Sequence, residues 1–336
     1  MTDREPSKEG ATAGEAPAAP PLATTEVQAE PISALVRAVP GLPRAVSFLP
    51  ALVAAIAFAW FASFLPAVAE GQVFVWSRPW IESLDIDFAF RLDGLGLVFA
   101  MLITGIGALV LLYTAGYFSG DPRIGRLLTL LVLFAISMLG LTLADDAVTL
   151  FLFWEGTTVT SFLLVGFDFQ KAYARRAALQ ALLITGLGGL ALLGGLLVLG
   201  GMLGTYRISE MNAAGDAIRA SAAYGPVLTL FLLAAFTKSA QFPFHFWLPG
   251  AMAAPTPVSA YLHSATMVKA GVYLLMRMTP ALGGTEAWFW ILGLFGAVTM
   301  LVGSVWALRQ TDLKLMLAHT TVMGLGTLVM FLGGGT

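Results

Sequence analysis

Long apolar runs recur along this chain and limit the folds that it can adopt. About nine of them have a length of roughly 20 residues: 48–68, 95–117, 125–143, 147–167, 177–203, 226–241, 258–276, 287–308 and 315–333. A helix of about 20 apolar residues crosses a hydrocarbon core of about 30 Å. Because an open sheet would leave backbone groups without partners in lipid, the runs predict an all-α, polytopic integral membrane protein of about nine transmembrane helices.

The composition agrees with a lipid environment and argues against several classes of function. Hydrophobic residues make up 58% of the 336 residues and charged residues 11%, against about 25% charged residues in soluble domains. The chain has no cysteine and three histidines, so iron–sulfur clusters, disulfides and multi-histidine metal sites are not expected. We therefore expect no cofactor and no resident metal, and no basic cluster indicates nucleic-acid binding.

Residues 1–43 differ from the rest of the chain. They are rich in Ala, Pro, Glu and Thr and contain few large apolar side chains, which predicts a disordered tail before a membrane domain at 44–336. No early apolar run is present, so the tail does not have the pattern of a secretory signal peptide. A solvated tail or a misplaced start codon is favoured over a binding arm.

Orientation follows from the lysines and arginines, because short positively charged loops stay in the cytoplasm. One side of the membrane is expected to hold Arg37, Arg44, Arg123, Arg126, Lys171, Arg175, Arg176 and Arg309. The other side is expected to hold Arg78, Arg91, Arg207, Arg219 and Arg277. The larger set predicts a multi-pass protein of the cell membrane with its N-terminal tail in the cytoplasm.

Residues 236–271 combine two lysines, two histidines and four prolines within apolar sequence. Lys238 lies some twelve residues into its run, where a charge costs about 2.5–3.5 kcal/mol on the insertion scale. The prolines that follow forbid a continuous helix: Pro243, Pro249, Pro255 and Pro257. Broken helices of this kind place ion sites near the membrane midplane in transporters.

Other ionisable side chains are predicted at a comparable depth. Glu155 lies near the middle of its run, with Thr158 one turn further on. Lys269 follows His263 by six residues, which on a continuous helix puts them about 120° and about 9 Å apart. Thr266 between them would extend a polar ridge.

Each of these residues also has a structural reading. Glu155 or Lys238 could belong to an inert ion pair that fixes helix packing. His263 could be a neutral histidine bonded to a carbonyl, and His245 a partner for backbone exposed at the break. Lys314 could extend its amine to the membrane interface. Taken together, however, Glu, Lys and His in membrane spans are typical of proton relays, and the residues predict a proton-coupled transporter or a component of a pump.

Four stretches resemble one known family. "LDGLGLVFAMLITGIGALVLLY", "LFLFWEGTTVTSFLLVGF", the 236–271 stretch and "QTDLKLMLAHTT" are similar to the antiporter-like subunits shared by Mrp cation/proton antiporters and respiratory complex I. The resemblance covers the chain from about residue 50 onward. "RRAALQALLITGLGGLALLGG" and His245 in "FPFHFWLP" resemble the largest, A-type subunit of the Mrp Na⁺/H⁺ antiporter.

The resemblance implies roles for individual residues. Glu155 would match the family's carboxylate on the fifth helix and Lys238 its partner on the broken seventh helix. The lateral proton relay would then continue through His245, His263, Lys269 and Lys314. The implied protein is not an enzyme but an ion-translocating subunit of a multisubunit Na⁺/proton antiporter, with other subunits as partners.

Two other functions stay open at this point. The chain could be a proton-pumping subunit of an NADH:quinone oxidoreductase or a related membrane hydrogenase, or a scaffold whose buried charges are inert. The family's channel consists of two inverted repeats of five helices, and this sequence ends within the expected tenth helix. We therefore expect one complete half-channel with a discontinuous helix, as in a fragment, a truncated gene model or one piece of a split subunit.

Overall fold

The computed structural model describes residues 43–81 and 86–335, so most of the predicted tail lies outside the described residues. Within these ranges, seven helical spans are long and apolar enough to cross a membrane. They are Ala45–Ala62, formed by α2 (Arg44–Ser47) and α3 (Leu49–Ala62), and α5 (Gly94–Tyr117), α6 (Ile124–Leu143), α7 (Ala147–Val165), α8 (Ala172–Leu203), α15 (Glu286–Leu308) and α16 (Leu313–Gly333). The predicted polytopic helical membrane protein is confirmed, and the two remaining runs form interrupted helices.

Side-chain caps define where several of these helices begin. Asp93 accepts from the backbone N–H of Gly96 at 2.9 Å at the start of α5. Asp146 accepts from two backbone N–H groups of α7, at 2.9 and 3.0 Å. Asp312 and Thr285 cap α16 and α15 in the same way. Each cap satisfies amides that have no partner within the helix, so the spans start at defined residues.

The proline-rich region consists of short pieces, as the sequence predicts. They are α11 (Tyr224–Lys238), the 3₁₀ helix η2 (Phe244–Phe246), α12 (Trp247–Gly250), the 3₁₀ helix η3 (Ala251–Ala253), α13 (Thr256–Ser259), the π-helix η4 (Ala260–Ala265) and α14 (Lys269–Leu282). The expectation of one continuous helix over 258–276 is wrong. Thr266 leaves the helical conformation, and its hydroxyl donates to the carbonyl of Tyr261 at 2.7 Å.

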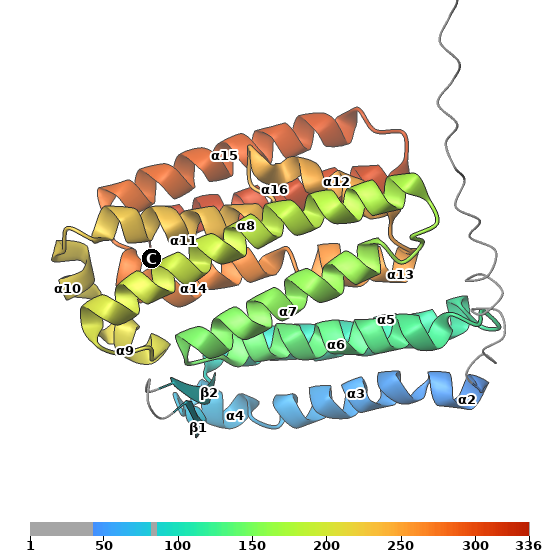
Figure 1. Cartoon of the computed structure of the whole chain (residues 1–336), viewed down its shortest axis with the longest axis horizontal. Helices are drawn as coiled ribbons and strands as arrows, with labels where there is room; N and C mark the ends of the chain where they lie inside the picture. Colours follow the sequence, from blue (N-terminus) through green and yellow to red (C-terminus); the bar gives the residue numbers. More distant parts are fainter. Residues whose placement is uncertain (1–42, 82–85, 336) are drawn as a thin grey trace, which may run out of the picture. The chain divides into compact units, whose positions relative to one another are not determined.

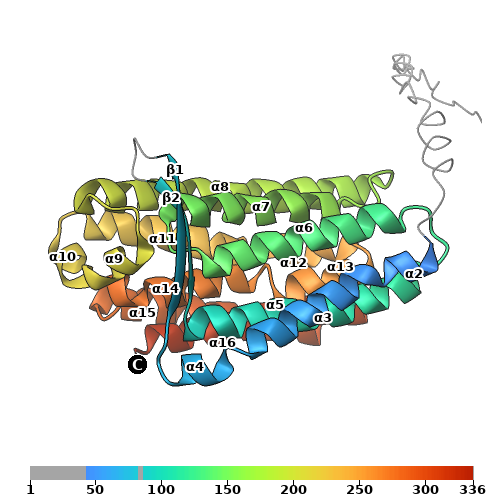
Figure 2. The same ribbon diagram turned by 90° about the horizontal axis from the view of Figure 1, so that it is seen from below.

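A β-hairpin at one end of the bundle departs from the all-α prediction (Figure 2). Its antiparallel strands are β1 (Phe74–Ile81) and β2 (Ile86–Leu92). Aromatic and β-branched residues favour strands, and the helical runs on either side hid this short segment. Three short helices complete the connections between spans: α4 (Leu65–Ala69), α9 (Ile208–Ala213) and α10 (Gly215–Ala220).

α8 positions the site because it packs against both α7 and α11 (Figure 1). Gly188 and Gly189 lie on the surface of α8 that faces these two helices. A Cβ on Gly188 would overlap Thr237 Oγ1 of α11, and a Cβ on Gly189 would overlap Glu155 Oε1 of α7. The glycine pair therefore lets polar side chains of both neighbours lie directly against the backbone of α8.

Candidate functional site

Lys238 is the last residue of α11 and is fully buried. Its Nζ donates to Thr158 Oγ1 at 2.8 Å and to the carbonyl oxygen of Trp154 at 3.2 Å, both on α7. The indole ring of Trp154 also contacts the amine, with 5.0 Å from Nζ to the ring centroid. A hydroxyl, a carbonyl and an aromatic face thus surround a side chain whose charge is costly to bury.

Glu155 directly follows Trp154 on α7, and its carboxylate lies against Gly189 of α8. Its Oε1 is buried and has no hydrogen-bond partner among the described residues. Glu155 and Lys238 are close enough to interact electrostatically. The amine of Lys238 nevertheless bonds to Thr158 and Trp154, so the structure has the two expected partners near each other without a direct bond.

Hydrogen bonds between side chains and backbone groups stabilise the break after α11. The indole Nε1 of Trp247 donates to the carbonyl of Thr237 at 2.9 Å. The backbone N–H of Phe242 donates to Thr299 Oγ1 of α15 at 2.9 Å. The first bond satisfies a carbonyl that the end of α11 leaves without a partner, and the second satisfies a backbone amide within the break, as burial in a membrane protein requires.

His263 and Lys314 line one small cavity of about 60 Å³, together with Met252, Thr256, Ser259, Ala260, Leu317 and Thr321. Both ring nitrogens of His263 are buried without a hydrogen-bond partner among the described residues. Lys314 is half-buried, and its Nζ donates to the carbonyl of Ala254 at 2.5 Å. A cavity of this size has room for about two water molecules, and the side chains of His263 and Lys314 both border it.

His245 lies in η2 and is half-buried, and its ring stacks on Phe242 with 5.7 Å between centroids. Its Nδ1 has no hydrogen-bond partner within the described ranges. The structure brings it close enough to His319 of α16 for an electrostatic interaction. His319 is buried, and its Nδ1 likewise has no partner there.

Lys269 begins α14 and is half-buried. Within the described part of the chain, its amine makes no hydrogen bond or ion pair. The predicted relation to His263 assumed a continuous helix, and the π-helix with the break at Thr266 replaces that geometry. The polar ridge through Thr266 is also not formed, because its hydroxyl donates to the carbonyl of Tyr261.

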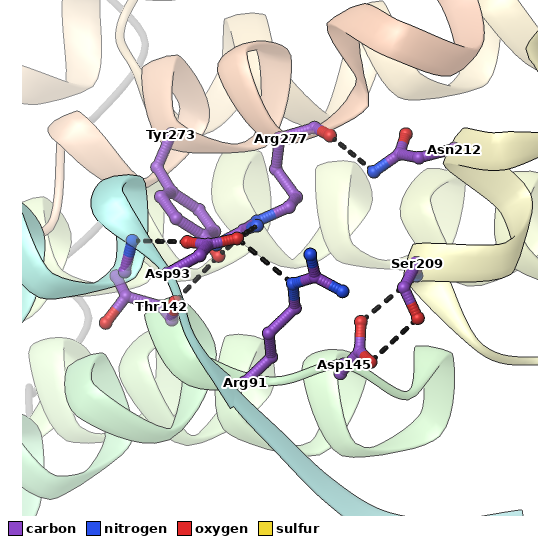
Figure 3. A network of polar contacts seen from close by, with 9 residues as sticks. Arg91, Asp93, Thr142, Asp145, Ser209, Asn212, Tyr273 and Arg277 are labelled. Atoms are coloured by element: carbon purple, nitrogen blue, oxygen red, sulfur yellow. Dashed lines mark hydrogen bonds and ion pairs between the residues drawn. The ribbon is translucent and has the colours of Figure 1, made fainter. Parts of the chain in front are cut away.

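A second polar cluster lies at the hairpin end of the bundle (Figure 3). Arg277 of α14 contacts the carboxylate of Asp93 with both terminal nitrogens, at 2.5 and 3.0 Å, and Arg91 contacts it at 3.2 Å. Arg277 Nε also donates to the hydroxyl of Tyr273 at 2.9 Å. These bonds join the hairpin, α5 and α14, so the cluster has a structural role.

Sequence reasoning missed several residues of the site. Gly189 was not singled out and His319 was not placed in the relay, although the runs "GLGG" and "LMLAH" are visible in the sequence. Trp154 and Trp247 were not singled out either. Their contacts with Lys238 and with the carbonyl of Thr237 depend on how three helices meet, which residue spacing does not specify.

A bundle with broken membrane helices and buried ionisable side chains has the architecture of membrane transporters and pumps. The family model described as "NADH:quinone oxidoreductase/Mrp antiporter, TM" matches residues 144–336. The chain therefore belongs to the NADH:quinone oxidoreductase/Mrp antiporter transmembrane family. A second model, "NADH-Ubiquinone oxidoreductase (complex I), chain 5 N-terminus", matches residues 78–127.

Curated relatives resemble the chain over about three quarters of its length. A probable K(+)/H(+) antiporter protein of Rhizobium meliloti, named as its A/B subunit, is 50% identical over 257 residues, which is 76% of this chain and 26% of the relative. The A-type subunit of the Na(+)/H(+) antiporter of Alkalihalophilus pseudofirmus is 48% identical over 259 residues, covering 77% of this chain and 32% of the relative. The resemblance to the A-type Mrp protein is thus confirmed, and the chain spans a quarter to a third of the length of these relatives.

Solved structures agree with this assignment. A chain of the Mrp complex from Dietzia sp. DQ12-45-1b superposes with a TM-score of 0.80 and 40% identity, over 90% of this chain and 34% of that one. A chain of a membrane-bound sulfane sulfur reductase, an archaeal respiratory membrane complex, gives a TM-score of 0.75 at 23% identity, over 89% of this chain and 49% of that one. The second match shows a shared fold.

Proposed function

We propose that this chain is an ion-translocating subunit of a multisubunit monovalent cation/proton antiporter, with Na⁺ as the cation. Protons would pass through a buried relay formed by Glu155, Lys238, His245, His263, Lys269 and Lys314. The observation that carries the proposal is the fully buried amine of Lys238, bonded to a hydroxyl and a carbonyl of α7, where Glu155 directly follows Trp154. A buried ammonium that has neutral hydrogen-bond acceptors close to a carboxylate can move between those acceptors and the carboxylate.

The exchange gives a proton switch. When Glu155 is ionised, its charge attracts the ammonium of Lys238. When a proton or a cation neutralises Glu155, the ammonium returns to Thr158 and can release a proton toward His263. The neutral amine then takes the proton from the carboxylic acid of Glu155, which restores the carboxylate and the ammonium. Each cycle started by a proton thus moves one proton from Glu155 through the lysine nitrogen to an imidazole nitrogen, and the charge of Glu155 controls the step.

The cavity beside His263 supports the next step. Both nitrogens of this histidine are free of protein hydrogen bonds within the described ranges, so neither is committed to a fixed protein partner. Lys314 lines the same cavity, and its amine, once neutral, would receive the proton of His263 through one or two water molecules. His245 and Lys269 would extend the relay on either side of this cavity, although no direct contact joins them to it.

The partners and the orientation are part of the proposal. Two of the similar proteins have names that specify antiporter subunits, and one similar structure is a Mrp complex, which supports a hetero-oligomeric assembly in the cell membrane. We propose that residues 1–43 form a cytoplasmic tail before the membrane domain. The loop between α7 and α8, which ends at Lys171, and the start of α8 with Arg175 and Arg176 would then lie on the same side.

The test is collapse of a pH gradient in everted vesicles from an antiporter-deficient strain that carries this chain within its native operon. Addition of Na⁺ should collapse the gradient in the wild type and in Lys171→Ala, an exposed lysine that serves as a matched control. Lys238→Ala should lose the response. Equal sodium responses of Lys238→Ala and the control would show that the switch is not at this lysine.

The second candidate is a proton-pumping subunit of an NADH:quinone oxidoreductase, which the match of residues 78–127 to a complex I model favours. The same vesicles distinguish the two functions. A gradient that NADH generates only with Lys238 intact, together with no effect of Na⁺, would support the respiratory function and contradict the antiporter.

A further inference from the structure

A group of cations lies at the loops that join α5 to α6 and α7 to α8. Figures 1 and 2 show both loops at the end of the bundle opposite the hairpin. With the first turns of α6 and α8, these loops carry five cations and two carboxylates, and we call them the basic rim: Arg123, Arg126, Lys171, Arg175, Arg176, Asp121 and Asp168. The basic rim therefore has a net charge of three positive units at one membrane surface.

Two of the five cations neutralise the two carboxylates. Arg123 contacts Asp121 at 2.9 Å and Asp168 at 2.8 Å, and it thereby joins the two loops. Lys171 also contacts Asp168, at 3.0 Å. Three arginines have no carboxylate partner among the described residues: Arg126, Arg175 and Arg176. The excess charge of the basic rim thus resides on guanidinium groups, which suit the geometry of phosphate oxygens.

Two of these arginines meet at one aromatic residue. The guanidinium of Arg126 lies 5.6 Å from the ring centroid of Phe169 and 5.4 Å from that of Phe167. Arg175 Nη1 donates to the backbone carbonyl of Phe169 at 2.7 Å. Stacking and this bond hold both groups in place, so less side-chain freedom is lost when an anion binds.

Arg176 lies beside a hollow in the surface. It lines an open cavity of about 640 Å³ together with Ala172, Tyr173, Ala177, Gln180 and Gly250. The guanidinium, phenol and amide groups that these residues contribute are all able to donate hydrogen bonds. The cavity therefore combines a charge with neutral donors, which is the chemistry that a phosphate diester requires.

An apolar stripe continues from Arg176 along α8. Leu179, Leu183, Leu187 and Leu190 follow Arg176 at spacings of one face of a helix, and each is at least half exposed. A free phosphate ion would not be stabilised by contact with apolar side chains, whereas an acyl chain can pack along them. The arrangement of charge at the membrane surface and apolar side chains below it matches the shape of a phospholipid.

We propose that the basic rim is a binding site for an anionic phospholipid. Arg176 and the neutral donors of the cavity bind the headgroup phosphate, Arg126 and Arg175 contribute positive charge, and one acyl chain lies along the leucine stripe of α8. The proposal needs only that the chain spans a membrane, so it stands independently of the antiport function.

The experiment measures lipid binding to the delipidated full chain in neutral detergent by native mass spectrometry. Phosphatidylglycerol and phosphatidylcholine with the same acyl chains are compared. We expect phosphatidylglycerol to bind more tightly, and Arg176→Gln to weaken it about fivefold, which corresponds to about 1 kcal/mol for one surface cation. Arg126→Gln should act in the same direction. The matched control is Arg309→Gln, since Arg309 is also exposed and stacks on an aromatic ring, Trp306.

Several results would overturn the proposal. Equal binding of the two lipids would remove the role of charge, and an equal loss in Arg309→Gln would remove the role of this site. Full competition by glycerol phosphate, which has no acyl chain, would identify a free-phosphate site instead.

Discussion

Thr158→Val tests the resting place of the Lys238 amine. The hydroxyl of Thr158 accepts from Lys238 Nζ at 2.8 Å and donates to the carbonyl of Trp154 at 3.2 Å. Valine has nearly the same shape but no hydroxyl, so the amine keeps one neutral acceptor. A hydrogen bond from a charged group contributes about 1.5–3 kcal/mol. Its loss should shift the amine toward Glu155 by a factor of about 10 to about 100.

If Lys238 exchanges between two positions, this shift traps it at the carboxylate and slows proton release. We therefore expect sodium-driven proton flux per assembled complex to fall at least about tenfold in Thr158→Val. Thr158→Ser, which restores the hydroxyl, should recover most of the flux. Both are measured in everted vesicles, with the amount of assembled complex determined in parallel.

The neighbouring Thr157 provides the matched control. It is also fully buried, and its hydroxyl donates to the same carbonyl of Trp154, at 2.7 Å, without contacting Lys238. Thr157→Val therefore removes a similar buried hydroxyl but leaves the lysine bond in place. Equal loss of flux in the two valine variants would refute the reasoning, because packing alone would then explain both.

Three further perturbations follow from contacts described above. Gly189→Ala places a methyl group against the buried carboxylate of Glu155 and should lower the free energy of unfolding by about 1–3 kcal/mol. Gly186→Ala is the control and should not destabilise the protein, because the space beside Gly186 is open. Similar melting temperatures for the two variants would contradict this prediction. The Arg123 hydrogen bond holds the pKa of Asp121 below its usual value, so the stability it contributes is present above the unfolded pKa of about 3.9 and is lost as pH falls through the folded pKa. In Arg123→Gln the melting temperature should therefore depend less on pH below about 4, and an unchanged pH profile would exclude the effect. Asp93→Asn keeps the helix cap but removes the carboxylate between two arginines. We therefore expect the free energy of unfolding, measured with denaturant, to fall by about 3 kcal/mol. A decrease under about 0.5 kcal/mol, as is typical of surface pairs, would show that the cluster is not structural.

Much of the bundle could be predicted from sequence because a lipid environment requires only a few properties of a membrane span. A span must be long, apolar and helical, so the positions of most helices followed from the apolar runs alone. The prolines after Lys238 equally predicted the break, since proline cannot continue a helix. The hairpin was missed because a strand of eight residues beside long apolar runs carries little distinct signal.

The site was less accessible to sequence reasoning, for a physical reason. The residue types were visible, but the hydrogen-bond partners of Lys238 depend on which residues of α7 face α11, and residue spacing did not point to the carbonyl of Trp154. The π-helix at Ala260–Ala265 changed the relation of His263 to Lys269. One extra residue in a helical turn rotates everything after it, and residue spacing alone does not reveal that insertion.

The bonds that close the break after α11 also restrict how this protein can move. Trp247 ties the end of α11 to α12, and the bond from Phe242 to Thr299 fastens the same joint to α15. A bend held in this way is rigid and does not act as a hinge. Opening it would leave the backbone groups of these two bonds without partners in an apolar interior at the same time. We expect ion movement here to proceed through rotation of long side chains within a nearly fixed frame, with helix displacement playing little part.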